Sequence, residues 1–366
     1  MRPSRNRLVM VAVAMIAIFS AVQSMGQGFS GLGTSAEGFS VPEPGRQFRF
    51  PRDHASHNDY RIEWWYLTAN LKDAAGNPYG IQWTLFRSAL KPEKGTQFSP
   101  SQMWFAHAAV TTAAEHLTSE TIARGGLGIA GVTAEPFKAW INEWEMRGDE
   151  KSPSDDALSR LRLRASGRDF SYEMTLQSDA PLAFHGDDGY SIKSESGQAS
   201  YYYSQPFYWV QGTINLPDGP VEVSGNAWLD REWSSQPLSA DQAGWDWISL
   251  HLDTGEKLMG FQLRNSDGSG YRSATWISSD GTTEAISDSH LKMEPLLRTS
   301  VAGRQVPTRW RVILTKRNLD VTIDAVNPKA WMYLSIPYWE GPVTVSGSHS
   351  GMGYLEMTGY PISPRN

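Results

Sequence analysis

The stretch DHASHNDYRIEWWY, residues 53–66, concentrates the residue types that could do chemistry. Two histidines lie three residues apart within it, with carboxylates on both sides. Imidazole and carboxylate groups bind zinc and other divalent metals, and they also form acid–base pairs. The spacing matches no standard metal motif, so a metal site would need His107 brought in by the fold. The alternative is a hydrogen-bonded polar network formed by Asp53, His54, His57 and Glu63.

A second acidic stretch is NAWLDREW, residues 226–233. As a strand it places Trp228, Asp230 and Glu232 on one face and Arg231 and Trp233 on the other. A carboxyl group buried against aromatic walls has a raised pKa and can keep a proton near neutral pH, and aromatic faces stabilise a developing carbocation. The stretch therefore predicts a proton donor for an apolar substrate. The alternative is an Asp–Arg or Glu–Arg ion pair that closes the end of a barrel.

The third candidate is GWDW, residues 244–247, in which Asp246 lies between Trp245 and Trp247. If both tryptophans face a cavity on a strand, Asp246 faces the other way. The alternative is a tryptophan pair in the core beside a solvated aspartate. The chain has no nucleophile elbow, no Walker A motif and no dinucleotide fingerprint, so we expect no ATP or NAD cofactor and no serine-hydrolase chemistry.

Two stretches of the chain resemble each other and indicate the elements that must position these residues. WWYLTANLKDAAGNPYGIQWTLFR begins at Trp64, and WDWISLHLDTGEKLMGFQLR begins at Trp245. Each is typical of a strand, a tight turn and a second strand, and each ends at an arginine, Arg87 or Arg264. A second pair, FYWVQGTINLPDGPVEVSG and PYWEGPVTVSG, follows in the same order.

The repeats predict a duplicated all-β protein with two tandem antiparallel barrels, because closed barrels leave no exposed sheet edge and suit ligand cavities. The polar stretch SSQPLSADQAG, residues 234–244, is the expected linker. A chain of 366 residues also exceeds one usual core. We expect a flexible segment over 27–48, a first domain over 49–235 and a second over 236–366.

The N-terminus is typical of a secretory signal peptide. Three arginines precede an apolar run from Leu8 to Val22, which is short for a membrane span, and small residues follow. We expect cleavage near Gly26 and an exported, periplasmic protein; the alternative is an uncleaved membrane anchor. The chain after residue 26 carries 30 basic and 39 acidic residues, a formal charge of −9, which argues against a nucleic-acid partner.

The chain contains no cysteine. This excludes disulfides, cysteine nucleophiles, iron–sulfur clusters and cysteine-ligated zinc, so an exported protein of this kind is held together by core packing. Its 15 tryptophans and 14 tyrosines favour large apolar interiors.

Five motifs in order resemble the family of CrtC-like and AttH-like proteins, which includes the carotenoid 1,2-hydratases (hydroxyneurosporene synthases). They are FPRDHASHNDYRIEWWYLTANL, MWFAHAAVT, YYYSQPFYWVQGTI, VSGNAWLDREWSS and GWDWISLHL. The resemblance extends from about Phe50 to the C-terminus. It implies two lipocalin-like barrels and an apolar ligand, lipid-like or polyene-like. It further implies that an ABC-transporter permease is the partner of signal-bearing members and that the stretch after Asp53 is a polar network at a barrel mouth.

The chain departs from the hydratase branch of that family at two places. The branch carries Asp-His-Asn-Trp where this chain has Asp-Arg-Glu-Trp (230–233), and its Tyr-x-Asp falls near residues 257–261, which hold no acid. In a hydratase of this sequence Asp230, Glu232 and Asp246 would have to supply the proton.

Three hypotheses follow from the sequence. The first is an exported protein that binds an apolar ligand beside a transporter, and the second is a hydratase or other acid-catalysed lyase. The third is a metalloenzyme with His54, His57 and His107, although our expectation is that no metal is bound. The expected ligand-binding residues are Trp64, Trp65, Tyr66, His107, Trp228, Trp233, Trp245 and Trp247.

Overall fold

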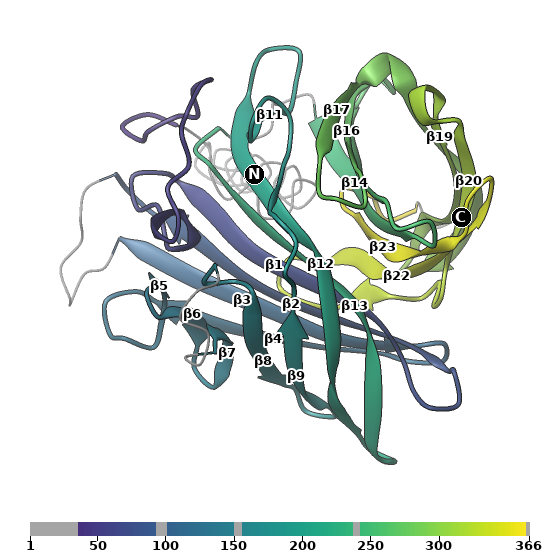
Figure 1. The fold of residues 1–366 in the computed structure, drawn as a ribbon, viewed down its shortest axis with the longest axis horizontal. Coiled ribbons are helices and arrows are strands. Elements are labelled where there is room, and N and C mark those ends of the chain that lie inside the picture. Colours follow the sequence, from purple (N-terminus) through teal and green to yellow (C-terminus); the bar gives the residue numbers. More distant parts are fainter. Residues whose placement is uncertain (1–35, 93–100, 150–155, 237–241, 364–366) are drawn as a thin grey trace, which may run out of the picture.

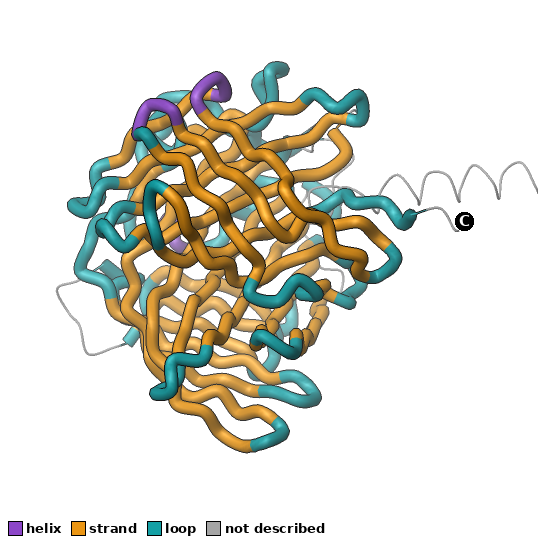
Figure 2. The backbone as a smooth tube through the Cα atoms, turned by 90° about the vertical axis from the view of Figure 1, so that its right-hand side faces the viewer, coloured by secondary structure: helices purple, strands orange, loops and turns teal. Residues whose placement is uncertain are grey.

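The computed structural model describes residues 36–92, 101–149, 156–236 and 242–363. Almost all of their regular structure is β-strand, arranged in two antiparallel sheets that each curl into a barrel (Figures 1 and 2). The predicted fold class, two tandem lipocalin-like barrels, is confirmed. The expected signal peptide, residues 1–26, lies outside the described residues, as do residues 237–241 of the expected linker. None of the helices in the described ranges is long and apolar enough to cross a membrane.

The first sheet has thirteen strands and takes up the chain from Ile62 to Ser234. They are β1 (Ile62–Lys72), β2 (Pro78–Ala89), β3 (Gln102–Thr112), β4 (His116–Arg124), β5 (Ala130–Ala134), β6 (Phe137–Ile141), β7 (Trp144–Gly148), β8 (Arg160–Ser166), β9 (Ser171–Gln177), β10 (Ala183–Phe184), β11 (Tyr190–Ile192), β12 (Ala199–Leu216) and β13 (Gly219–Ser234). Their order is β4-β3-β2-β1-β13-β12-β9-β8-β7-β6-β5, with β10 and β11 paired to β12.

The second sheet has ten strands. They are β14 (Gln242–Leu252), β15 (Lys257–Asn265), β16 (Gly270–Ile277), β17 (Thr283–Ser287), β18 (Leu291–Val301), β19 (Arg304–Leu314), β20 (Leu319–Ala325), β21 (Trp331–Met332), β22 (Tyr338–Gly347) and β23 (Gly351–Met357). Their order is β17-β16-β15-β14-β23-β22-β20-β19-β18, with β21 paired to β22. Short 3-10 helices are η2 (Arg52–His54), η3 (Asp288–His290) and η4 (Thr315–Arg317).

The two strand orders repeat each other, as the internal resemblance predicts. β1 and β14 hold the same place, each between the second strand of its hairpin and the last strand of its sheet. The resemblance between the stretches that begin at Trp64 and Trp245 therefore reflects equivalent hairpins, β1–β2 and β14–β15. The second pair matches only in part: its Tyr-Trp beginnings lie on the equivalent strands β12 and β22, but the Val-x-Val-Ser-Gly endings lie on β13 and β22, which are not equivalent.

Each barrel has its own apolar core, and a third core joins them. β8 and β9 alternate buried and exposed residues because only one of their faces meets a core. β1 and β14 are buried on both faces. One face of each strand fills its own barrel, and the other contributes to a shared cluster that includes Tyr66, Tyr202, Trp228, Trp247 and Phe261. The barrels therefore pack side by side along β1, β13, β14 and β23.

Candidate functional site

A cavity of about 1120 Å³, counting its open mouth, lies between the two barrels. Strands β1, β12 and β13 of the first barrel and β14, β15, β22 and β23 of the second contribute its walls. The walls are mostly apolar and aromatic, and they include Trp64, Tyr66, Tyr202, Trp245, Trp247 and Phe261. A concave, largely apolar space with a few polar groups is the usual form of a small-molecule site.

Half of the residues expected to bind a ligand line this cavity: Trp64, Tyr66, Trp245 and Trp247. The other four lie behind its walls or inside a barrel. Trp65 is buried under the guanidinium of Arg231, whose Cζ lies 3.8 Å from the ring centroid. Trp233 stacks on His57 with a centroid distance of 3.9 Å. His107 is buried, and its Nδ1 lies 2.9 Å from the hydroxyl of Tyr338, which does line the cavity.

Asp230, predicted from the sequence as a proton donor, is buried in the cavity wall on β13. Its Oδ1 accepts hydrogen bonds from Trp228 Nε1 at 2.6 Å and from Ser204 Oγ, and its Oδ2 accepts one from the Tyr202 hydroxyl at 3.0 Å. Burial raises the pKa of Asp230 to about 7 despite these donors, and the nearby Glu232 adds to the rise. The carboxyl group can therefore hold a proton near neutral pH beside an apolar space.

Glu232 lies in the same wall, since the expected alternation places it on the same face of β13 as Asp230. It accepts a hydrogen bond from Ser200 Oγ and forms an ion pair with Lys193, with 2.8 Å between Nζ and Oε1. The same Nζ lies 4.4 Å from the ring centroid of Phe261. Glu232 is thus tied to a cation within the wall, whereas Asp230 has no such partner among the described residues.

A second protonatable carboxyl group, that of Glu356 on β23, reaches the cavity from the opposite barrel. Its Oε1 accepts a hydrogen bond from Trp245 Nε1 at 2.7 Å. Burial raises the pKa of Glu356 to about 7; the tryptophan donor opposes this rise, and the carboxylates of Asp230 and Glu232 add to it. The cavity therefore has one such acid from each barrel.

Asp246 is the predicted acid that does not line the cavity. Because Trp245 and Trp247 face the cavity, Asp246 points to the other side of β14. There it is buried, 2.9 Å from Arg264 Nε, and it accepts a hydrogen bond from the Tyr360 hydroxyl at 2.8 Å. Burial raises the pKa of Asp246, and Arg264 opposes the rise. This geometry is that of a buried ion pair on the side of β14 away from the cavity.

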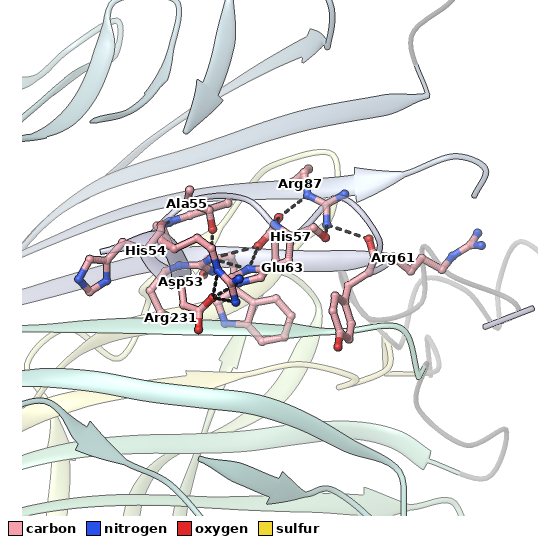
Figure 3. Close-up of polar contacts among 12 residues, drawn as sticks. Asp53, His54, Ala55, His57, Arg61, Glu63, Arg87 and Arg231 are labelled. Carbon is pink, nitrogen blue, oxygen red and sulfur yellow. Dashed lines mark hydrogen bonds and ion pairs between the residues drawn. The ribbon is translucent and has the colours of Figure 1, made fainter. Parts of the chain in front are cut away.

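The stretch after Asp53 forms a dense polar network in the first barrel (Figure 3). The fully buried carboxylate of Glu63 is its centre and accepts hydrogen bonds from Arg87 and, at 3.0 Å, from Arg231. It also contacts His57 twice, at 2.8 Å from the backbone N and at 3.2 Å from Nδ1. Burial would raise the pKa of Glu63, but Arg87, His57 and Arg231 together hold it well below its usual range. Glu63 is therefore a buried anion at neutral pH and not a proton donor.

The other members of the network are also satisfied. Asp53 accepts hydrogen bonds from Arg49 N at 2.7 Å and from Arg46 at 3.1 Å. Burial would raise the pKa of Asp53, but His57, Arg49 and Arg46 together hold it well below its usual range. His54 bonds the Tyr203 hydroxyl at 2.7 Å through Nδ1. The sequence-predicted polar network thus exists, but none of its four predicted members lines the cavity.

The structure does not bring the three histidines of the metal hypothesis onto common partners. His54 contacts Tyr203 and Asp156, His57 contacts Glu63 and Asp53, and His107 contacts Tyr338 and Glu120. Within the described ranges, no group of three or more His, Cys, Asp or Glu side chains has the arrangement of a metal site.

Several residues of the cavity were not identified from the sequence. In strand register Glu356 lies opposite Trp247, just as Asp230 lies opposite Tyr66. Extending the internal repeat to the strand that pairs with each hairpin would have identified it. Other residues in or behind the cavity wall, among them Lys193, Ser200, Tyr202, Ser204 and Phe261, carry no such signal.

Comparisons with known proteins agree with this architecture. The model of the AttH-like family matches residues 41–360. A crystal structure of a protein from Nitrosomonas europaea described as AttH is 33% identical and has a TM-score of 0.78, covering 88% of this chain and 100% of that one. No curated protein matches the chain.

Two further proteins of known structure are similar in fold alone. Kievitone hydratase from Nectria haematococca is 14% identical, with a TM-score of 0.65 over 88% of this chain and 96% of that one. CghA, whose structure was determined with Sch210972, is 11% identical, with a TM-score of 0.54 over 83% of this chain and 90% of that one.

Proposed function

This chain belongs to the AttH-like family, and from that premise we propose that it binds an apolar small molecule, lipid-like or polyene-like, in the cavity between its barrels. The observation that carries the proposal is the aromatic lining contributed by both barrels, including Trp64, Tyr66, Trp247 and Phe261. Moving apolar surface from water into such a space is favourable, and the few carboxyl groups in the wall would orient a polar end.

The test uses retinol, a polyene alcohol, as the probe and isothermal titration calorimetry as the measurement. Ile336 lines the cavity and is only partly buried, so Ile336→Trp would narrow the space without disturbing a core. We expect the wild type to bind one retinol with a negative heat-capacity change, the mark of apolar burial. Ile336→Trp should weaken binding at least about tenfold, or about 1.4 kcal/mol.

The matched control is Leu297→Trp, which adds the same side chain at an exposed position of β18 that does not line the cavity. It should bind as the wild type does. Equal weakening in both variants, or no binding by the wild type, would contradict the proposal.

A second candidate function is acid-catalysed hydration of a C=C bond, favoured by the raised pKa of Asp230 in an apolar wall. Asp230 would give its proton to one alkene carbon, and the cation formed on the next carbon would lie against aromatic faces. Water would add to that carbon and release a proton, which restores the acid. One fold neighbour is named a hydratase.

The two candidates separate at Asp230→Asn. A binding protein should still bind the ligand in this variant, because the amide has nearly the shape of the carboxyl group and can still contact a polar end, and neither form should yield a product. An enzyme should still bind its substrate but should no longer form the product that is heavier by one water, measured by mass spectrometry of the extracted mixture.

We further propose that the protein is exported and acts beside an ABC-transporter permease. The basic N-terminus followed by the apolar run Leu8–Val22 supports export, and the family resemblance supports the partner. Cell fractionation with N-terminal sequencing should find a periplasmic chain that begins near residue 27, and cross-linking there should capture a permease. An intact chain in the cytosol would contradict the proposal of export.

A further inference from the structure

A buried histidine that neither candidate function uses lies behind the acid of the cavity wall. His185 directly follows β10 and has no solvent exposure. Its Nε2 lies 2.6 Å from Ser204 Oγ, and its ring lies against that of Tyr202 with a centroid distance of 4.1 Å. Among the described residues its Nδ1 has no hydrogen-bond partner. A buried polar atom left in this way is uncommon and calls for an explanation.

Ser204 connects this histidine to the cavity. Its Oγ donates a hydrogen bond to Asp230 Oδ1 and is at the same time the partner of His185 Nε2. Asp230 lines the cavity, whereas Ser204 and His185 do not. The three side chains therefore form one continuous hydrogen-bonded chain that begins at the carboxyl group facing the ligand space and ends at the free Nδ1.

Such a chain can run in two directions because a serine hydroxyl donates one hydrogen bond and accepts another. When Asp230 is ionised, His185 Nε2–H donates to Ser204, Ser204 donates to Asp230, and Nδ1 carries no proton. When Asp230 is protonated, its O–H donates to Ser204, Ser204 donates to Nε2, and the imidazole proton is on Nδ1. In both states the imidazole is neutral.

We propose that Asp230, Ser204 and His185 form a proton wire, in which His185 is a positioning residue that holds and resupplies the proton of Asp230. A proton that reaches Nδ1 when the buried site opens transiently to water displaces the Nε2 proton to Ser204, and the Ser204 proton passes to Asp230. One proton enters and one carboxyl group is protonated, so charge and atoms balance. The proposal rests on the second candidate function, since only a proton donor needs resupply.

The surroundings favour a change of tautomer over a change of charge at His185. Burial, aided by Lys193, lowers the pKa of His185 well below its usual value, so the ring stays neutral. The other polar groups that face Asp230 are Tyr202, Trp228, Glu232 and Glu356. Tyr202 and Trp228 donate directly to Asp230, and Glu232 opposes its ionisation. Among the described residues Ser204 Oγ bonds only His185 and Asp230, so none of these four groups passes a proton through Ser204.

The test is nitrogen-15 NMR of the full protein without ligand, with labelled histidine, between pH 5.5 and 8.5. The ring nitrogen shifts distinguish the two neutral tautomers from each other and from the cation. We expect His185, assigned by the loss of its signals in His185→Gln, to change from the Nδ1–H to the Nε2–H tautomer with a midpoint near pH 7, the pKa of Asp230. His116, which is half-buried and bonded to Thr111, should keep one tautomer throughout and serves as the internal control.

Two variants separate the wire from a general effect of pH. Asp230→Asn removes the titrating group and Ser204→Ala removes the link, so in each the change near pH 7 should disappear. A wild-type His185 that keeps one tautomer, that becomes a cation, or whose change persists in Ser204→Ala would overturn the proposal. The measurement needs no substrate, so its failure is distinct from the failure of ligand binding.

Discussion

The raised pKa of Asp230 has a direct consequence for the pH dependence of stability. A carboxyl group with a pKa of 3.8 in the unfolded chain and about 7 in the folded one binds more protons in the folded state between those values. The free energy of unfolding therefore falls as the pH rises from about 4 to about 7. At about 1.4 kcal/mol per pKa unit, this carboxyl group alone lowers it by about 4 kcal/mol across that window.

The perturbation that isolates this effect is Asp230→Asn. The amide has nearly the shape of the carboxyl group, its oxygen can still accept from Trp228 and Ser204, and it does not ionise. The variant should be more stable than the wild type at pH 8. Its free energy of unfolding should fall by up to about 4 kcal/mol less than that of the wild type between pH 4 and 8. Urea unfolding followed by tryptophan fluorescence at half-unit steps from pH 4 to 8 measures this.

The control is Asp320→Asn, which removes a carboxyl group paired with Arg311 on the surface of the second barrel. It should leave the slope of the wild type between pH 5 and 8 in place. If Asp230→Asn has the same pH dependence as the wild type, or is destabilised equally at every pH, then Asp230 does not hold a proton in the folded protein and the acid-donor reasoning is refuted.

Three further substitutions test the packing that surrounds the site, each followed by urea unfolding. Glu63→Gln leaves Arg87 buried without its carboxylate and should lower the free energy of unfolding by about 3–5 kcal/mol at pH 7. Because the pKa of Glu63 is lowered in the folded protein, the wild type loses this stabilisation as the pH falls below about 4.5. The stability of the variant should therefore be less sensitive to acid. Tyr66→Phe removes the hydroxyl that donates to Glu340 across the two barrels at 2.6 Å and should cost about 1–3 kcal/mol. Gly225→Ala would place a Cβ 2.0 Å from a carbonyl oxygen of β1 and should cost about 1–3 kcal/mol.

Much of the fold could be predicted because its signals are local. Period-two alternation over residues 226–233 correctly placed Asp230 and Glu232 on one face and Arg231 on the other. The Gly and Asp turns and the matching stretches at Trp64 and Trp245 indicated two equivalent hairpins, which the strand order contains. The repeated Val-x-Val-Ser-Gly endings were wrongly predicted to lie on equivalent strands, because similar alternating strands recur at non-equivalent places in a sheet.

The chemistry of individual residues depended on partners far away in the chain. The sequence could not decide between a metal site and a polar network after Asp53, because the deciding partners of Glu63 are Arg87 and Arg231, 24 and 168 residues away. The place of Glu356 opposite Trp247 depends on the pairing of β23 with β14, which only an extension of the internal repeat to that strand would have indicated. Residue types suggest what a site could do, but the long-range pairing decides which groups meet.

The most direct test of the interdomain binding site is a crystal structure with a brominated long-chain alcohol, whose bromine is located by anomalous scattering. We expect one bromine position between the barrels, within van der Waals contact of walls such as Trp247 and Phe261, and its loss in Ile336→Trp. A bromine position inside either barrel, or none in crystals of the wild type grown at saturating alcohol, would contradict it.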